Sequence, residues 1–281
     1  MKASCALIIG SLVASEAFRT NVYSLRRSAF RLHSTATSTI RTDPTPVYIE
    51  DTDAYGIMYN SNHLRAFDRA LIDFSHPVVS MDSLVFKAAP TMGQEYWIEG
   101  EEQEDGSWNL ELKNGSIVYS IIQGVRVSSN LPSATPLEGA NKLASWTFAT
   151  HRDEYENHLI GRMPLHRVLN LFERSRSNFI GGPAALKRLR DESDIVILVT
   201  SMEQLTLLAG DSTHCQPGTR VTVETGFVSK RKGRVLECRH VAKVDGVPVA
   251  QGIVNLLLLQ ESTGRPTNRL PDWLKDMMGI E

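Results

Sequence analysis

Apolar residues recur at helical intervals in two widely separated segments of the chain. The first stripe consists of Leu64, Phe67, Leu71 and Phe74. The second consists of Leu165, Val168, Leu169 and Phe172. Residues at these intervals share one face of an α-helix, so we expect each segment to form a helix with one buried face. The residues that we expect at the helix starts are Asn60, Ser61 or Asn62 in the first segment and Pro164 in the second.

After each helical stripe the pattern changes to alternating apolar and polar residues, which is typical of strands. We expect strands over Gln94–Glu102, Ser116–Val127, Thr219–Gly226, Val235–Val244 and Val249–Leu259. Hairpin turns are predicted at Asp105-Gly106, Asn114-Gly115, Asp245-Gly246 and, from a weaker signal, Lys232-Gly233. A helix followed by antiparallel strands, twice over, predicts an α+β fold in which a curled sheet wraps a helix in each half.

The two halves of this pattern resemble each other in sequence. The matching blocks are Gly56 with Gly161 and Phe67–Arg69 with Phe172–Arg174 (161 − 56 = 105), Ser80–Leu84 with Ser201–Leu205 (201 − 80 = 121), and Met92–Gln94 with Pro217–Thr219 (218 − 93 = 125). A repeat of more than a hundred residues is too long for a solenoid unit and indicates a duplicated domain. A chance likeness of two amphipathic helices is the alternative, and the ordered later blocks argue against it.

The duplication sets the expected domain boundaries. The segment 129–142 is rich in Ser, Pro, Gly and Asn and lacks apolar periodicity, so we expect it to be a linker. The first domain would then cover 43–128 and the second 143–262, with a C-terminal tail over 263–281.

The N-terminal segment has the composition of a targeting sequence. Lys2 precedes an apolar stretch, Ala6–Val13, that is too short to span a bilayer, and small residues follow at Ala14–Ala17. Residues 18–42 are rich in Arg, Ser and Thr and contain no Asp or Glu. We expect a signal peptide over 1–17 and a transit peptide over 18–42, which together resemble a bipartite plastid presequence. A mitochondrial presequence or a disordered tail is the alternative.

Composition narrows the function classes. The chain has a formal net charge of −2 and no basic cluster interleaved with aromatic residues, which argues against binding of nucleic acid. Its cysteines, Cys5, Cys215 and Cys238, show no spacing that a zinc site would need, so no metal is indicated. Cys5 lies in the segment expected to be removed, and the remaining pair are expected to be reduced core residues rather than a disulfide. The 281 residues suffice for a sizeable core.

The acidic stretch before the first helix contains the candidate chemistry. A carboxylate such as that of Asp53 can act as a nucleophile or general base, and Gly56 allows the chain to turn after it. Free backbone amides near Tyr59 and Asn60, at the start of the helix, can stabilise an oxyanion. Ordinary helix capping is the alternative function of such a run, and Asp51 is expected to fix the loop or face solvent.

This stretch resembles the hotdog-fold acyl-CoA thioesterases related to 4-hydroxybenzoyl-CoA thioesterase. The residues that carry the resemblance are Asp51, Thr52, Asp53, Gly56, Tyr59, Asn62, Asp68 and Arg69. The resemblance implies a double hotdog that mimics a hotdog dimer, as a monomer or as a homodimer of double hotdogs. It further implies hydrolysis of a fatty or aromatic thioester of CoA or acyl carrier protein without a cofactor and without a membrane span. Asp53 would be the catalytic carboxylate, and the oxyanion amide would lie at about Asn60.

The resemblance also gives candidate residues around the carboxylate. Tyr59 is assigned to the catalytic site with Asp53 and Asn60, and the candidates for substrate binding are Gly56, His63 and Arg65. The positively charged residues Lys230, Arg231 and Lys232 could meet phosphates or an acidic carrier protein. A solvated turn is the alternative for these three residues.

In the second copy the Asp-Thr-Asp sequence is replaced. By the offset of 105 residues, Asp53 matches His158 and Asp51 matches Glu156, so this copy has lost the catalytic carboxylate. Glu173, which matches Asp68, is expected to form a surface ion pair rather than to act in the site. Two other functions stay open, a hotdog dehydratase or isomerase that would use His63 and a non-catalytic acyl-binding protein.

Overall fold

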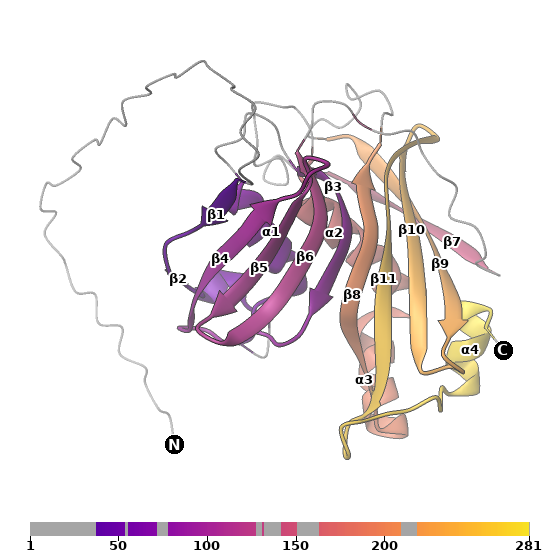
Figure 1. The fold of residues 1–281 in the computed structure, drawn as a ribbon. Coiled ribbons are helices and arrows are strands. Elements are labelled where there is room, and N and C mark those ends of the chain that lie inside the picture. Colours follow the sequence, from indigo (N-terminus) through magenta and orange to yellow (C-terminus); the bar gives the residue numbers. More distant parts are fainter. Residues whose placement is uncertain are drawn as a thin grey trace, which may run out of the picture. The chain divides into compact units, whose positions relative to one another are not determined.

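One antiparallel sheet forms the framework of the molecule, and α1 and α2 pack side by side on one of its faces (Figure 1). The computed structural model describes residues 38–53, 56–71, 78–127, 131, 142–150, 163–208 and 218–280, all of which lie in a compact unit that starts at residue 37. The strand order is β1-β4-β5-β6-β3-β8-β11-β10-β9-β7, with β2 paired to β4 and β12 to β11.

The elements divide into two sets that follow the predicted duplication. The first half contains β1 (Thr39–Arg41), β2 (Thr45–Pro46), the 3-10 helix η1 (Ile49–Asp51), α1 (Asn60–Ala70), β3 (Val78–Phe86), β4 (Glu95–Glu102), β5 (Trp108–Asn114) and β6 (Ile117–Val127). The second half contains β7 (Leu143–Ala149), α2 (Leu165–Phe179), α3 (Gly182–Ser193), β8 (Ile195–Leu207), β9 (Arg220–Lys230), β10 (Val235–Val244), β11 (Val247–Gln260), β12 (Arg265–Pro266) and α4 (Asp272–Met278).

The two halves meet through their matching strands. Ser80 of β3 pairs with Thr206 of β8, and Val85 pairs with Ser201. With the offset of 121 residues, Ser201 is the copy of Ser80 and Thr206 is the copy of Val85. Each position therefore pairs with the copy of the other, which is the pattern of a two-fold symmetric interface. The sequence repeat is thus expressed as an internal pseudo-dimer.

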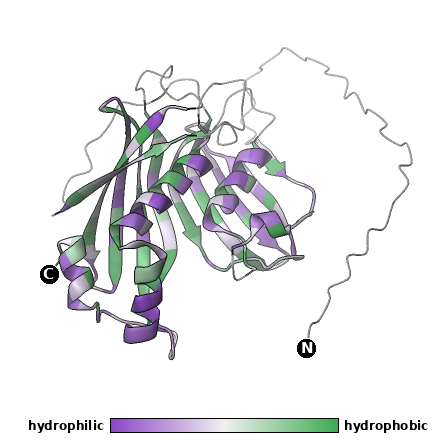
Figure 2. Ribbon diagram, turned by 180° about the vertical axis from the view of Figure 1, so that it is seen from behind, coloured by the Kyte–Doolittle hydropathy of each residue, from purple (hydrophilic) through white to green (hydrophobic). Residues whose placement is uncertain are grey.

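Both central helices bury the described part of the predicted apolar stripe, and Phe74 lies outside the described residues. In α1 Leu64 and Phe67 are buried, and in α2 Val168, Leu169 and Phe172 are buried. Figure 2 shows the hydrophilic sides of both helices turned away from the sheet. Tyr59 and Pro164 occupy the N-cap positions, and neither helix has a side-chain cap hydrogen bond. The expected capping by Asn60, Ser61 or Asn62 is therefore wrong, since Asn60 is already the first helical residue.

The predicted strands and turns are confirmed within a few residues at each end, and the 10-residue strand over Val235–Val244 has the predicted bounds. Gly106, Gly115, Gly233 and Gly246 all have positive φ, as tight hairpin turns require. The matching residues Gly93 and Gly218 have φ of +83° and +91°, and only glycine adopts such values readily.

The second copy contains a helix that the sequence analysis did not predict, and it accounts for part of the growth in offset between matching residues of the two copies. Fifteen residues, 180–194, separate α2 from β8, and twelve of them form α3. The corresponding connection in the first half, 71–77, has only seven residues. The connection is eight residues longer in the second copy (15 − 7), which is half of the growth in offset from 105 to 121, and the inserted residues form α3. The other eight residues come from the longer α2, which ends four residues beyond the copy of Ala70, and from β8, which begins four residues before the copy of Val78.

The predicted boundaries fall close to the ends of the sheet. The sheet begins at Thr39, inside the range 18–42 assigned to the transit peptide, and that boundary stays a prediction. The signal peptide and most of the linker lie outside the described residues. In the tail, α4 buries Leu274 and Met278. No helix among the described residues is long and apolar enough to cross a membrane.

Candidate active site

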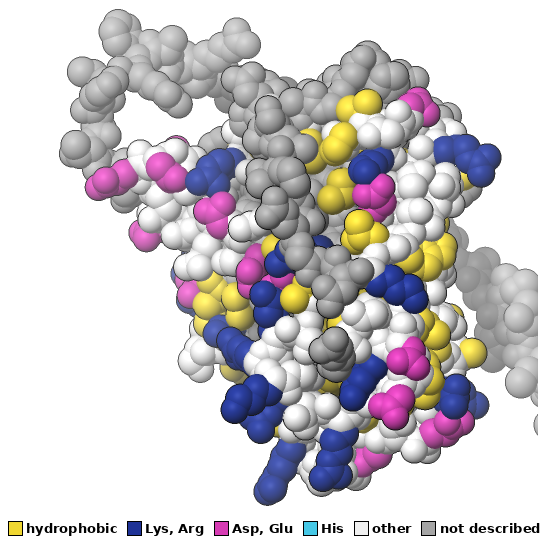
Figure 3. Space-filling model, turned by 90° about the vertical axis from the view of Figure 1, so that its right-hand side faces the viewer, with side chains coloured by type: hydrophobic (Ala, Val, Ile, Leu, Met, Phe, Trp, Pro, Cys, Tyr) yellow, Lys and Arg dark blue, Asp and Glu magenta, His cyan; other side chains and the backbone are white. Residues whose placement is uncertain are grey.

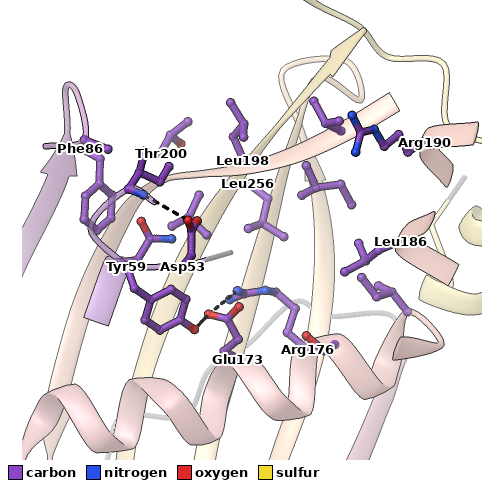
Figure 4. Close-up of a pocket in the computed structure, with 18 of the residues that line it drawn as sticks. Asp53, Tyr59, Phe86, Glu173, Arg176, Leu186, Arg190, Leu198, Thr200 and Leu256 are labelled. Atoms are coloured by element: carbon purple, nitrogen blue, oxygen red, sulfur yellow. Dashed lines mark hydrogen bonds and ion pairs between the residues drawn. The ribbon is translucent and has the colours of Figure 1, made fainter. Parts of the chain in front are cut away.

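A cavity of about 880 Å³ lies between the two halves of the molecule. The first half contributes Asp53, Tyr59 and Asn60 from the loop before α1 and from the start of that helix. The second half contributes residues of α2, α3 and β8. The site is therefore composite, and neither half forms it alone. Figure 4 shows Asp53 and Glu173 at the same end of the cavity, with Glu173 extending from α2.

A tight turn places Asp53 at the cavity. The N–H of Gly56 donates to the carbonyl of Asp53 at 3.0 Å, and the N–H of Asp53 donates to the carbonyl of Ile57 at 2.9 Å. Gly56 has φ of +73°, which explains why glycine follows the acidic run. The carboxylate accepts a hydrogen bond from the N–H of Ile57 at 3.3 Å. The side chain is thus held in the cavity by the turn that it belongs to.

Asp51 has a different role from Asp53. It is 5% exposed, and its carboxylate accepts the N–H of Tyr48 at 3.1 Å. Its carbonyl accepts the side-chain amide of Asn62 at 3.0 Å and the N–H of Tyr59 at 2.9 Å. These bonds fasten the loop to the first turn of α1, and this is the loop-fixing role expected for Asp51.

The start of α1 offers a backbone donor in the cavity that Asp53 also lines. Among the described residues, the N–H of Asn60 donates to no acceptor, as is usual in the first turn of a helix, and Asn60 lines the cavity. The N–H of Tyr59 is already used by Asp51. The expectation of free amides at both positions is therefore wrong for Tyr59 and holds for Asn60.

Tyr59 reaches the cavity through its hydroxyl. This hydroxyl donates a short hydrogen bond to the carboxylate of Glu173, and Nη2 of Arg176 lies 3.3 Å from the same carboxylate (Figure 4). Burial, together with the negative charge of Glu173, raises the pKa of Tyr59 above its usual value, so the hydroxyl stays protonated. The interaction joins the start of α1 to the middle of α2.

Comparison with solved structures identifies the fold to which this architecture belongs. A protein described as an oleoyl thioesterase from Lactobacillus plantarum superposes with a TM-score of 0.59 at 8% identity, over 79% of this chain and 97% of that chain. A 12:0-ACP thioesterase from Umbellularia californica superposes with a TM-score of 0.55 at 8% identity, over 82% and 94% of the two chains. The chain is a double hotdog. No protein-family model and no curated protein matches it.

In this double hotdog His63 lies in the cavity wall but is held by other residues. It is 1% exposed, its Nδ1 is hydrogen-bonded to the hydroxyl of Ser120 at 2.9 Å, and its ring meets Phe86 edge to face. Burial lowers the pKa of His63 to about 4, so the ring is neutral near pH 7. These contacts describe a packed core histidine, and they do not favour the acid-base role that a dehydratase would need.

The remaining candidate site residues of the double hotdog either do not line the cavity or lie outside the described residues. Gly56 shapes the turn, and among the described residues neither Gly56 nor Arg65 lines the cavity. Arg65 lies on α1, where its charge acts on Tyr96 of β4. Lys230 ends β9, Arg231 and Lys232 lie in the turn to β10, and none of the three lines the cavity. His158 and Glu156 lie outside the described residues, as does Cys215.

Glu173 is the site residue that sequence reasoning placed wrongly. It was expected in a surface ion pair with its neighbour, whereas its partners are Tyr59 and the buried Arg176. The sequence signal was present, because Glu173 matches Asp68 in the repeat, but only the packing of α2 beside α1 shows which way it faces. Among the described residues, no three His, Cys, Asp or Glu side chains cluster as metal ligands would.

Proposed function

We propose that the double hotdog hydrolyses an acyl thioester of CoA or acyl carrier protein, with Asp53 as the catalytic carboxylate. The observation that carries the proposal is the pairing of Asp53 with the amide of Asn60 in one cavity. A carboxylate can act as the base in thioester hydrolysis, and a helix N-terminal donor can stabilise the oxyanion that forms. The thioesterase names of the two similar structures support the reaction class.

In the proposed reaction the carboxylate of Asp53 removes a proton from water as the water oxygen attacks the thioester carbonyl carbon. The carbonyl oxygen becomes an oxyanion, which the N–H of Asn60 and the positive end of α1 stabilise. Collapse of this intermediate breaks the C–S bond, and the proton on Asp53 passes to the departing sulfur. Direct attack by Asp53 on the carbonyl would give an anhydride instead. A single turnover in ¹⁸O-water tests this route, because an anhydride allows label to enter Asp53.

Glu173 acts as a positioning residue in this proposal. Its bond to the hydroxyl of Tyr59 fixes the residue immediately before Asn60, and Arg176 fixes Glu173 in turn. The second half thereby holds the oxyanion donor of the first half in place. A plastid location, from the predicted presequence, and a monomeric or homodimeric assembly belong to the same proposal.

The decisive experiment measures thiol release from a panel of acyl-CoA and acyl-carrier-protein substrates. Asp53→Asn should lower kcat/KM about 10²- to 10⁴-fold, the range over which general acid-base groups contribute. Asp82→Asn is the matched control, since Asp82 lies on β3 with an exposed side chain paired to Arg126 and outside the cavity lining. Absence of turnover in the parent chain would refute the function. Full activity in Asp53→Asn would refute the site.

A further inference from the structure

Away from Asp53, the cavity continues along β8 as a channel with apolar walls. Its apolar lining residues include Ile180, Leu186, Leu189, Ile197, Leu198 and Met278. Figure 4 shows Thr200 at the end that holds Asp53 and Leu186 and Arg190 at the opposite end. The far end of the channel thus combines apolar residues with three charged residues of α3, Lys187, Arg190 and Asp191.

The channel exists because β8 extends beyond its partner strand. β8 has 13 residues and β3 has nine, and their pairing ends at Val85 and Ser201. The part of β8 from Ile195 to Thr200 is paired to β11 on one side only among the described residues. The inserted helix α3 packs against this part of β8. The channel is therefore a product of the insertion that distinguishes the second copy from the first.

We propose that this channel holds the aliphatic chain of a fatty acyl thioester and that Leu186 of α3 helps to set the chain length. The inference rests on the proposed thioesterase function and adds the substrate class. Leu186 is 37% exposed and Leu198 is 46% exposed, although both line the cavity. Large apolar side chains left partly in water inside a cavity are the surface that an apolar ligand covers.

The length of the channel favours a fatty chain over an aromatic group. Five residue steps separate Thr200 from Ile195, which is about 17 Å at the rise of a β-strand. An extended alkyl chain with C–C bonds of about 1.5 Å advances roughly 1.3 Å per carbon, so the distance accommodates roughly 13 carbons. A single aromatic ring would cover only the part nearest Asp53 and leave Leu186 exposed.

The charged residues along the channel are compatible with an apolar chain. Arg176 is neutralised by Glu173 at the catalytic end. Arg190 is hydrogen-bonded through Nε to Glu261 at 2.8 Å, and its side chain is about half exposed. Long cationic side chains such as that of Lys187 can line a channel with their methylene stems while their charged ends stay in water.

The first test is equilibrium binding of saturated fatty acids with 6 to 18 carbons, and of benzoate, to the full-length chain by calorimetry. For the parent chain, Kd should fall about fourfold per added methylene and level off near 13 carbons, with benzoate weaker than the long chains. Leu186→Trp should move the plateau two to four carbons shorter and weaken binding of the longest acids at least tenfold. Leu143→Trp, at an exposed Leu of β7 outside the cavity lining, should change nothing.

Hydrolysis of thioesters of the same acids separates this inference from the proposed function. Fatty acid binding with the expected profile but no turnover would refute the thioesterase and support the channel. Turnover with a chain-length profile that Leu186→Trp leaves unchanged would refute the channel and support the thioesterase. Leu186→Ala provides a second variant, which should relax the length preference. Equal or tighter binding of benzoate would overturn the inference.

Discussion

The first half of the molecule contributes the loop that carries Asp53, and the second half contributes most of the residues that line the cavity. The two halves have matching central helices and matching strand order, and their β3 and β8 strands pair about a pseudo-two-fold axis. Only the first half has an aspartate at the position of Asp53, and only the second has α3. In a dimer of identical chains, every wall residue would serve both sites. Fusion removes this constraint, because each half can then change without the other.

The halves also differ in charge. Residues 43–127 contain five Lys and Arg against 14 Asp and Glu, a net charge of −9, whereas residues 142–281 contain 19 against 16, a net charge of +3. Figure 3 shows Lys and Arg side chains gathered toward the lower part of the face that the second half presents. An acidic or phosphate-bearing carrier would be repelled by the first half and attracted by the second.

We expect the central helices of the two halves to contribute equally to stability through their packing, although the halves differ in chemistry. Phe67 and Phe172 match in the repeat, and both are fully buried. Phe67→Ala and Phe172→Ala should each lower the free energy of unfolding by about 3–5 kcal/mol, the usual cost of a large cavity. Urea denaturation followed by circular dichroism measures both, with Phe67→Leu and Phe172→Leu as milder variants. Costs that differ by more than about 2 kcal/mol would show that the copies are packed differently.

The sequence predicted the likeness of the two halves because that likeness depends on local sequence patterns. The stripe that contains Phe67, the turn at Gly106 and the offset between Gly56 and Gly161 all follow from local spacing. The inserted helix α3 was not predicted, although the growth of the offset by 16 residues (121 − 105) marked its place. An offset shows that residues are inserted and does not show what structure they adopt.

Each half also contains one buried histidine bonded to a hydroxyl. Nδ1 of His63 lies 2.9 Å from Ser120, and Nδ1 of His240 lies 2.9 Å from Thr225. Burial lowers the pKa of both rings, to about 4 for His63. The unfolded chain therefore binds more protons than the folded chain between about pH 4 and the ordinary histidine pKa of about 6.5.

The free energy of unfolding should consequently be highest above pH 6.5 and fall as the pH drops toward 4. His63 alone accounts for up to about 3 kcal/mol of this fall. Urea denaturation between pH 7.5 and 4 measures the slope, which should be shallower in His63→Asn and in His240→Asn. Slopes identical to that of the parent chain in both variants would rule out these rings as the source of acid sensitivity.

The functional asymmetry is tested by changing matching acids on the two central helices. Glu173→Gln should lower kcat about 10- to 100-fold, because the bond to Tyr59 that positions Asn60 loses its charge. Asp68→Asn, at the matching position of α1, should change kcat less than threefold. Thiol release gives both rates, and thermal unfolding checks that both variants fold. Equal losses in the two variants would show that the contact between Glu173 and Tyr59 has no special role in positioning Asn60.

The position of Glu173 shows what sequence reasoning could not supply. The sequence repeat identifies Glu173 as the counterpart of Asp68, because this match depends only on local spacing. Its place in the cavity that Asp53 also lines depends on how α2 packs beside α1 across a pseudo-two-fold interface, and no local pattern encodes that contact. The same limit applies to Tyr59, whose hydroxyl rather than its amide faces the cavity.

The smallest expected effect concerns the charge difference between the halves. Lys187 is an exposed residue of α3 that lines the cavity, whereas Lys232 lies in the exposed β9–β10 turn outside the lining. Lys187→Glu should raise KM for a CoA or carrier-protein thioester about two- to fivefold at low ionic strength, and the change should vanish in about 0.5 M salt because exposed charges are screened. Lys232→Glu makes the same change of charge and should leave KM nearly constant. If Lys232→Glu raised KM more than Lys187→Glu, the carrier would bind at the β9–β10 turn rather than at the channel beside α3. Equal effects of both variants would mean that the overall positive charge of the second half, rather than any one residue beside the cavity, attracts the substrate.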